Sequence, residues 1–600
     1  MHQPNAMNEA RGKQDKARSL LQPMPLIMLG YPFGKTLEEW QSGVPVDCGE
    51  TWKKEAIEAA VIRGPHPTAR AADAVALVNE DVAYQVKAGF SKIVLWDDIK
   101  DNLPSSFKIS PVAVIPQEGR RGRIILDLSF AVRLEQKPGR RKAGLLLQEA
   151  VNDTTIPLAP RRPVREIGKV LPRVLEFMAS RKAGQDILLS KVDLSNGFWR
   201  IIVKETAWWN FCYVMPDPPG APIRIVVPSA LQMGWMASSQ NFCTTTETGR
   251  DFIQWLVDQK IDCPPNPLEK FMLPQDLVGT IGPDEPAPTD EADDGTSSIN
   301  VYVDDYILAV VEDAARTLLR RITRATLYGV HSIFPPPEIT NHKGGKDSIS
   351  IKKLEKGDAT FMTKKLVLGF MLDGKERTVR LPLEKAEKID TELQRLLKKS
   401  RVPSKRFLSI TGKVSNATRI LPAAKGLMTP LYKALRGTPK MIGLGKHSEL
   451  RIALADLRQI IHSLGARETH VSELVQLTPQ AAGTCDASAE GAGGVWLGNH
   501  FHPTVWRIKW PPDVVERYRQ GILTNSALEM AAISGRMLIL EQLTPMRRQH
   551  SRLFSDNTPA VSWTTNLVAK ADSIVAARLL RALAMRSRTT EAALPLTTHW

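Results

Sequence analysis

The 600-residue sequence has only five cysteines, and no two of them form a C-x-x-C pair. Cys48, Cys212, Cys243, Cys263 and Cys485 lie far apart in the chain, which argues against a disulfide framework and against a structural zinc site. No apolar run reaches the roughly 18 residues needed to cross a bilayer. The apolar PLIML near the polar start is too short for a secretory signal. These absences predict an intracellular protein, in the cytoplasm, the nucleus or both, without a membrane segment.

Acidic side chains are in the minority. The sequence has 80 Lys and Arg against 64 Asp and Glu, a net charge of +16 and a pI near 9.5. Such a balance is typical of proteins that bind a polyanion, and the lack of membrane signals favours nucleic acid as the partner. The excess is large between Lys385 and Lys446, with 15 basic residues and three acidic ones. A basic run is often only a solvated surface, but on helices it also suits contact with a phosphate backbone.

The chain is too long for a single core, and its patterns divide it into segments. Residues 1–85 give little to read. SPVAVIPQ and RGRIILDLSF predict a hairpin with a basic turn at 119–122, and DILLSKVDLSNGFWRIIV predicts two strands around a turn at 195–197. Residues 259–299 are rich in proline and acid, which predicts a flexible surface insertion.

Beyond residue 380 the pattern becomes helical. Phe407, Ile410, Val414 and Ala417 recur at three- and four-residue spacing, so we expect them to form one apolar helix face. A further unit begins near Thr478 with GTCDASAEGAGGVWL, which predicts a strand, a turn and a strand. The sequence shows no internal repeats and no coiled-coil heptads.

Two adjacent acids, Asp304 and Asp305, lie in the apolar stretch VYVDDYILAV. Adjacent carboxylates oppose each other's ionisation unless a hard cation neutralises them, and Mg²⁺ prefers such oxygen ligands. Asp193, at the end of the strand predicted in SKVDLSNGF, is the natural third ligand. Two Mg²⁺ ions held in this way can stabilise the attacking and leaving oxygens of a phosphoryl displacement. We therefore expect a two-metal site, with Mn²⁺ as an alternative ion.

The YVDD motif at 302–305, between two predicted strands, resembles the signature of reverse transcriptases. Asp193 with Gly197 and Phe198 resembles the first catalytic motif of the same family. The resemblance extends over roughly residues 86–600. It implies an α+β right-hand polymerase with fingers, palm and thumb. It also implies that the partners are an RNA template, a DNA primer and deoxynucleoside triphosphates.

The same resemblance implies contacts to the incoming nucleotide. RIILDLSF is similar to the fingers strand whose arginine, here Arg123, binds the triphosphate, a role that suits a planar guanidinium. LQMGWMASSQNF is similar to the motif that holds the template and the nascent pair. There Gly234 would allow close backbone approach, and Met233 departs from the family pattern. Phe198 falls where the family keeps a ring that excludes a 2′-hydroxyl, although it could instead be a core residue.

Further resemblances concern the primer and the leaving group. LVLGF is similar to the short hairpin that grips the primer end, with Leu368 and Gly369 at its turn, and Tyr302 would also contact primer or template. A lysine could serve as general acid towards pyrophosphate. Lys343 and Lys346 both lie in a suitable place, and the spacing does not choose between them. Lys346 is taken as the candidate nucleotide contact.

Asp486, Glu529 and Asp556 resemble the first three acids of ribonuclease H. TCDASAEGAGGVW, NSALEMAA and LFSDNTPAVSW are similar to the strands and helices that carry them. Each motif alone is commonplace, but the three occur in the family's order. They imply a second pair of Mg²⁺ ions that activates water to cut the RNA of an RNA/DNA hybrid. The family's fourth acid would follow the final LPLTTHW, so we expect a truncated domain whose activity is in doubt.

These resemblances predict four parts. They are an N-terminal extension (1–85), fingers and palm (86–380), a basic helical thumb or connection (381–475), and an α/β ribonuclease H-like domain (476–600). LPLEKAEKI and SKRFLSITGKVSNATRILPAAKGLMTPLY are most similar to retrotransposons of the tyrosine-recombinase (DIRS-type) or gypsy-type branches. The expected function is therefore that of a retrotransposon RNA-directed DNA polymerase, and the sequence leaves the oligomeric state open.

Two rival hypotheses remain. An RNA-dependent RNA polymerase shares a palm with paired aspartates, but it lacks a ribonuclease H and usually has a small or polar residue where Phe198 stands. A decayed or domesticated element protein would bind nucleic acid without turnover. Nucleotide selectivity tests the first rival, and primer extension with Mg²⁺ tests the second.

Overall fold

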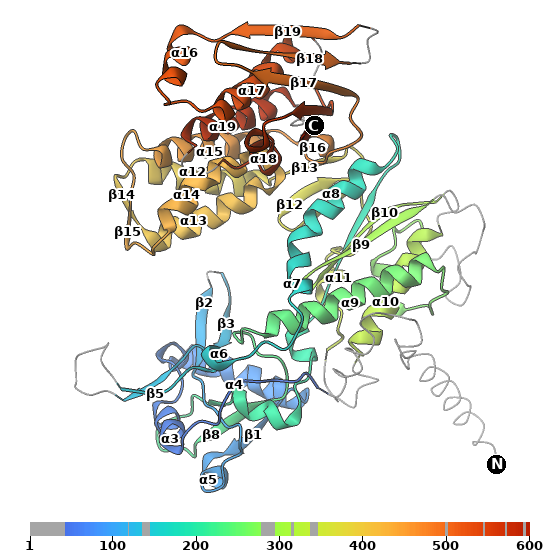
Figure 1. Cartoon of the computed structure of the whole chain (residues 1–600). Helices are drawn as coiled ribbons and strands as arrows, with labels where there is room; N and C mark the ends of the chain where they lie inside the picture. The colour runs from blue at the N-terminus through green and yellow to red at the C-terminus, as the bar shows by residue number, and fades with distance from the viewer. Residues whose placement is uncertain are drawn as a thin grey trace, which may run out of the picture. The chain divides into compact units, whose positions relative to one another are not determined.

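The computed structural model describes residues 43–117, 119–134, 145–277, 295–313, 317–336, 346–498, 502–543, 547–569, 573–591 and 596–599. Two compact units account for the chain: a first unit of residues 1–170 and 190–361, and a second of 171–189 and 362–600. Both contain helices and strands (Figure 1), so the chain is mixed α and β, as expected. Among the described residues, no helix combines the length and the apolar character that a membrane span needs.

The central sheet of the first unit has the strand order β6-β10-β9, with β9 and β10 antiparallel. Helix α9 packs against β9, and α10 packs against α9 (Figure 1). Residues 306–311 of β10 are all buried because this strand lies in the middle of the sheet. The bounds are β6 Leu188–Asp193, β9 Thr296–Tyr302, β10 Asp305–Val311, α9 Ser238–Asp258, α10 Leu318–Ile333 and α11 Ile351–Leu354.

The rest of the first unit is built from small antiparallel sheets and short helices. The sheets have the orders β1-β8-β7, β2-β3 and β4-β5. Their strands are β1 Ser91–Leu95, β2 Val112–Gln117, β3 Arg120–Leu126, β4 Val132–Leu134, β5 Leu145–Gln148, β7 Tyr213–Val214 and β8 Arg224–Pro228. The helices are α3 Lys54–Arg63, α4 Ala72–Lys87, α5 Trp96–Ile99, α6 Val151–Thr154 and α7 Arg162–Glu166. Helices α3 and α4 thus give ordered structure to part of the region left unassigned from sequence.

Two predictions in this unit need correction. The turn expected at 119–122 is shorter, because β3 already begins at Arg120. The strand expected after the turn at 195–197 does not form: a 3₁₀ helix, Gly197–Arg200, is followed by isolated bridges at Ile202 and Val203. Asn196, at φ 54°, turns the chain into that helix.

The expected insertion at 259–299 is partly wrong. A 3₁₀ helix, Pro267–Phe271, starts with a capping box from Asn266, and Met272 and Leu273 are buried. The Arg324 guanidinium lies 3.2 Å from the Glu269 carboxylate and ties this helix to α10. Strand β9 also begins earlier than expected. Apolar side chains between the prolines therefore order both ends, and residues 278–294 lie outside the described residues.

The second unit begins with α8 and a sheet of order β11-β12-β13-β16, next to a group of four helices. Phe407, Ile410, Val414 and Ala417 are buried on one face of α13, which confirms the predicted apolar face. The bounds are α8 Val170–Ser180, β11 Lys364–Val367, β12 Phe370–Asp373, β13 Thr378–Arg380, β16 Thr469–His470, α12 Leu383–Leu397, α13 Ser404–Ala417, α14 Lys425–Leu435 and α15 Glu449–Ala466, with the pair β14 Arg401–Pro403 and β15 Met441–Gly443.

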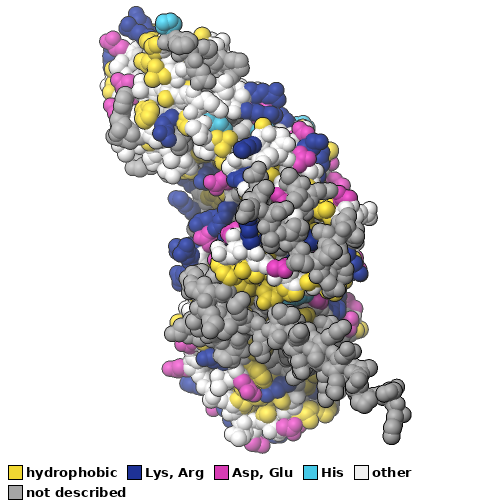
Figure 2. Space-filling view, turned by 90° about the vertical axis from the view of Figure 1, so that its right-hand side faces the viewer, with side chains coloured by type: hydrophobic (Ala, Val, Ile, Leu, Met, Phe, Trp, Pro, Cys, Tyr) yellow, Lys and Arg dark blue, Asp and Glu magenta, His cyan; other side chains and the backbone are white. Residues whose placement is uncertain are grey.

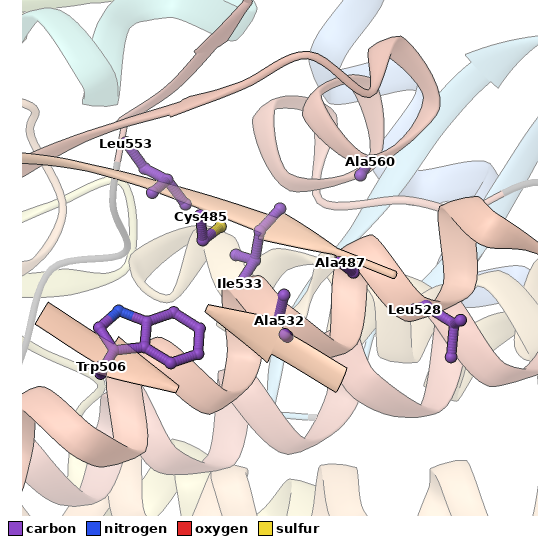
Figure 3. Packing of buried hydrophobic residues seen from close by; sticks show 9 residues of the cluster. Cys485, Ala487, Trp506, Leu528, Ala532, Ile533, Leu553 and Ala560 are labelled. Atoms are coloured by element: carbon purple, nitrogen blue, oxygen red, sulfur yellow. The ribbon is translucent and has the colours of Figure 1, made fainter. Parts of the chain in front are cut away.

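A five-stranded sheet of order β19-β18-β17-β20-β21 completes this unit, antiparallel at β19-β18-β17 and parallel at β17-β20-β21. Helix α17 packs on it, and Leu528, Ala532 and Ile533 meet Cys485 and Leu553 in the core (Figure 3). The bounds are β17 Ala481–Ala487, β18 Gly491–Leu497, β19 Thr504–Lys509, β20 Ser551–Ser555, β21 Leu596–His599, α16 Pro512–Arg519, α17 Asn525–Leu543, α18 Thr558–Asn566 and α19 Ile574–Thr590.

The five-stranded sheet domain and the helices before it are joined by buried polar contacts. Arg588 of α19, 4% exposed, donates hydrogen bonds to Ser463 Oγ, Thr469 Oγ1 and the Arg467 carbonyl at 2.9, 2.6 and 2.7 Å. A buried guanidinium needs such partners, because leaving it unpaired is costly. Residues 362–600 therefore form one compact unit, across the border predicted at 475/476.

Candidate active sites

The YVDD motif lies at the tip of the β9–β10 hairpin. Tyr302 pairs with Asp305, which leaves Val303 and Asp304 as a two-residue loop. Val303 has φ 59°, a left-handed conformation that costs a β-branched residue on the order of 1–3 kcal/mol. The sequence prediction of two strands around this motif is confirmed. The tight turn places both acids at one edge of the sheet.

Asp193 ends β6, which lies next to β10 in the sheet. The Leu194 amide donates to the Asp304 carbonyl at 2.9 Å, so the two chain segments run together at the site. Burial, followed by the hydrogen bond that protonated Asp305 donates to the Asp193 carboxylate, raises the pKa of Asp305 to about 7. Burial and then the charge of Asp193 also raise the pKa of Asp304. The structure thus brings together the three acids predicted from sequence.

Two lysines neutralise these carboxylates. Lys353 of α11 donates to Asp193 Oδ1, and Lys191 Nζ lies 3.8 Å from Asp305 Oδ1 and 3.6 Å from Asp358 Oδ2. Sequence reasoning missed both lysines. Lys191 had a usable signal, because it precedes Asp193 by two residues on one strand and so shares its face. Lys353 carries no such sequence signal, because it lies 160 residues from its partner Asp193.

Lys346, the lysine selected from sequence, does not contact the three acids. Its ammonium lies 5.4 Å from the centroid of the Tyr84 ring, and its carbonyl accepts a hydrogen bond from Arg200 at 2.6 Å. Lys343, the other candidate, lies outside the described residues. Within the described ranges, the lysines that contact these acids are Lys353 and Lys191, and Lys346 is not one of them.

Arg123 and Gly234 lie close to each other. Arg123 Nη2 is 3.1 Å from Met233 Sδ, so the residue that departs from the family pattern contacts the candidate triphosphate ligand. Gly234 has φ 111°, and a Cβ there would lie 2.6 Å from the Leu126 carbonyl oxygen. The backbone at Gly234 thus approaches strand β3 closely, as the sequence predicted for this glycine. This contact fixes the loop beside Arg123.

Phe198 stacks on Phe242 of α9, with ring centroids 4.5 Å apart and planes at 17°. Gly197 makes room for this stack, because a Cβ there would lie 2.6 Å from the Phe242 ring. The ring of Phe198 is only half-buried. The stack fixes the position of the ring, and its role beside the sugar of a nucleotide stays a prediction.

The LVLGF hairpin forms in the second unit. Val367 pairs with Phe370, so Leu368 and Gly369 make a two-residue loop with φ 51° and 82°. Positive φ at both positions is the type I′ pattern of tight hairpins. The predicted turn is confirmed, and a role in holding a primer stays a prediction.

A second carboxylate site lies at the ends of β17 and β20, which are parallel neighbours. One oxygen each of Asp486, Glu529 and Asp556 lies within 4.8 Å of the others, close enough to share a metal ion. Among the described residues, this is the one group of three possible ligands whose ligand atoms lie so close together. The carboxylate oxygens of Asp193, Asp304 and Asp305 are farther apart. Glu529 is 1% exposed, and burial, followed by the charge of Asp486, raises its pKa to about 7.

Both sites contain a buried oxygen that lacks a hydrogen-bond partner within the described ranges: Oδ1 of Asp305 and Oε2 of Glu529. A buried carboxylate oxygen without a partner is costly, and a hard cation is the ligand that would relieve the cost. The oxygen-only donor sets suit Mg²⁺ or Mn²⁺ rather than zinc. The residues present therefore fit the metals implied by the sequence.

Comparisons with known proteins add three likenesses. No family model matches the chain, and no curated protein sequence matches it. Among solved structures, a foamy viral protease-reverse transcriptase (dRH) bound to double-stranded DNA gives a TM-score of 0.42 at 14% identity, covering 98% of this chain and 81% of that chain. The foamy viral protease-reverse transcriptase in complex with double-stranded DNA gives a TM-score of 0.41 at 14% identity, covering 98% of this chain and 97% of that chain. The same kind of protein in complex with an RNA/DNA hybrid gives a TM-score of 0.39 at 14% identity, covering 98% of this chain and 62% of that chain.

Proposed function

We propose that the chain is an RNA-directed DNA polymerase. The observation that carries this proposal is the meeting of Asp193, Asp304 and Asp305 at one edge of a buried sheet, with a buried oxygen of Asp305 that accepts no hydrogen bond and has only the Lys191 ammonium nearby, at 3.8 Å. Carboxylates that raise one another's pKa favour a bound cation, and the overall charge of +16 suits a nucleic-acid substrate. Figure 2 shows Lys and Arg side chains at many places on one face of the molecule. The proposed partners are an RNA template, a DNA primer and deoxynucleoside triphosphates.

Two Mg²⁺ ions on the three aspartates would activate the primer 3′-hydroxyl and neutralise charge on the phosphates. The other steps belong to side chains of this chain. Arg123 would bind phosphate oxygens through its planar fork. Lys353, paired with Asp193, would protonate the departing pyrophosphate, a role that its ammonium can fill once the acid is engaged elsewhere. Phe198 would lie under the sugar and exclude a 2′-hydroxyl.

A second function, cleavage of RNA in an RNA/DNA hybrid, is favoured by the compact trio of Asp486, Glu529 and Asp556. Metal bound there would activate water. Glu529, with its raised pKa, would ionise fully only when the cation is present. Purified protein should therefore degrade the RNA strand of a hybrid in Mg²⁺, and Glu529→Gln should abolish cleavage.

Retrotransposon origin and the DIRS-type or gypsy-type branch belong to the same proposal and rest on the sequence resemblance alone. The RNA polymerase rival is disfavoured by the bulky ring of Phe198, which the stack on Phe242 holds in place. The decayed-element rival is disfavoured by the presence of both acid trios.

Primer extension on an RNA template tests the main proposal. Wild type should extend a DNA primer with deoxynucleotides in Mg²⁺, and Asp305→Asn should reduce the rate by about 1,000-fold, because losing metal-based stabilisation costs several kcal/mol. Template–primer binding should persist in the variant. Extension with ribonucleotides alone would favour the RNA polymerase, and binding without any extension would favour the decayed element.

A further inference from the structure

Helix α4, from the region that sequence left unassigned, forms one wall of a cavity in the first unit. The cavity has a volume of about 210 Å³. Leu77, Asp81 and Gln85 line one side, at the four-residue spacing of a single helix face. Arg123 and Asn196 line it from other elements. The helix therefore faces the same space as the arginine proposed to bind the triphosphate.

Tyr84, on the same turn of α4, makes two contacts with the catalytic region. Its hydroxyl accepts a hydrogen bond from Asn196 Nδ2 at 3.2 Å. Its ring faces the Lys346 ammonium, which lies 5.4 Å from the centroid. One side chain thus holds an amide through its hydroxyl and a cation through its ring.

Both partners of Tyr84 are themselves anchored close to the metal-binding acids. Asn196 follows Asp193 by three residues and has φ 54° and ψ 38°, a left-handed conformation that a side-chain hydrogen bond helps to hold. Arg200 donates to the Ser195 carbonyl at 2.7 Å and to the Lys346 carbonyl at 2.6 Å. The backbone under the exposed Lys346 is therefore fixed to the turn that follows Asp193.

We propose that Tyr84 is a positioning residue for the incoming nucleotide. Its ring holds the Lys346 ammonium and its hydroxyl holds Asn196. A cation is thereby kept beside a residue that shares a partner with it, because Tyr84 contacts both Lys346 and Asn196, and Asn196 lines the same cavity as Arg123. Two cations near a metal-binding aspartate suit the triphosphate of a nucleotide, whose negative charge is concentrated there. The inference rests on the proposed polymerase function and gives Lys346 a place in nucleotide binding without contact to the acids.

Single-nucleotide incorporation at saturating template–primer tests it. Tyr84→Leu removes both ring and hydroxyl, and the KM for the deoxynucleotide should rise about two- to five-fold, the size of an exposed cation–π contact, with kcat unchanged. Tyr84→Phe keeps the ring, so its KM should rise less, about two-fold. Lys346→Ala should raise KM as Tyr84→Leu does. In the Lys346→Ala background, Tyr84→Leu should add no more than the roughly two-fold effect of the lost hydroxyl, because the contact between ring and ammonium is already gone.

Ala83→Ser, at the exposed neighbouring position on α4, is the matched control and should leave KM unchanged. If Tyr84 only packs the helix, Tyr84→Leu will lower kcat and the melting temperature together, will leave KM unchanged, and will act independently of Lys346. That result overturns the inference while the polymerase proposal stands. A wild-type protein that incorporates no nucleotide overturns both.

Discussion

Glu529→Gln gives the sharpest physical test of the second carboxylate site. Burial raises the pKa of Glu529 to about 7, whereas a glutamate in an unfolded chain titrates near ~4.3. A group with a higher pKa in the folded state favours folding below the unfolded value and loses that contribution as the pH rises through the folded value. The metal-free protein should therefore lose local stability between about pH 4.5 and pH 8.

The size of the effect follows from the two pKa values. Their difference corresponds to at most about 3.7 kcal/mol, at 1.36 kcal/mol per pH unit. Asp486 and Asp556 are exposed and admit solvent to the site, so we expect about 2 kcal/mol. Glutamine cannot ionise. Glu529→Gln should therefore stabilise the metal-free protein by about 2 kcal/mol near pH 8 and change it little near pH 5.

Hydrogen exchange of peptides covering β17 and α17 measures this local stability with EDTA and with Mg²⁺. Wild type should gain protection from Mg²⁺ mostly at the higher pH, and the variant should gain little at either pH. Glu516→Gln, at an exposed position on α16, is the control and should show no pH-dependent change. The reasoning would be refuted if Glu529→Gln lowered protection near pH 8 in EDTA, because the ionised carboxylate would then be stabilising the fold.

Lys353→Met should lower the rate of single-turnover extension by about 100-fold, the usual worth of a general acid, with little change in the KM for the nucleotide. Phe242→Leu should raise the use of ribonucleotides by about two- to ten-fold, because the Phe198 ring, proposed to exclude a 2′-hydroxyl, loses its stacked partner. The measurement is the ratio of kcat/KM for a ribonucleotide to kcat/KM for the deoxynucleotide. Arg588→Met leaves several buried polar groups unpaired, so denaturant unfolding of the second unit should show a loss of about 3 kcal/mol.

Local patterns predicted much of the fold. Apolar residues on both sides of two adjacent acids indicated the hairpin at YVDD, the resemblance to a known family supplied the hairpin at LVLGF, and the three- and four-residue spacing identified the buried face of α13. The errors are also local. Residues 195–203 looked like a turn and a strand, yet the left-handed Asn196 leads into a 3₁₀ helix. Sparse apolar residues such as Met272 order part of a segment whose composition looked flexible.

Long-range pairing explains what the sequence could not predict. Lys353 meets Asp193 across 160 residues, and Asn196 meets Tyr84 across 112. No spacing rule links residues so far apart, and a lysine has no pattern that separates a site residue from a solvated one. The acids were found because adjacent carboxylates are unusual in an apolar strand. Their counter-charges could be found only from the folded chain.

The two groups of three acids differ in what offsets their negative charge, and we expect this difference to affect how each binds metal. Lysines contact Asp193 and Asp305, so the proposed polymerase site has cationic side chains of its own. The trio of Asp486, Glu529 and Asp556 is compact, and the protonation favoured at Glu529 takes the place of a counter-charge. Under the proposed function, the lysine beside the first site would supply a proton donor where the leaving group departs. At the second site, the proton on Glu529 must leave before metal can bind, so metal affinity there should rise with pH.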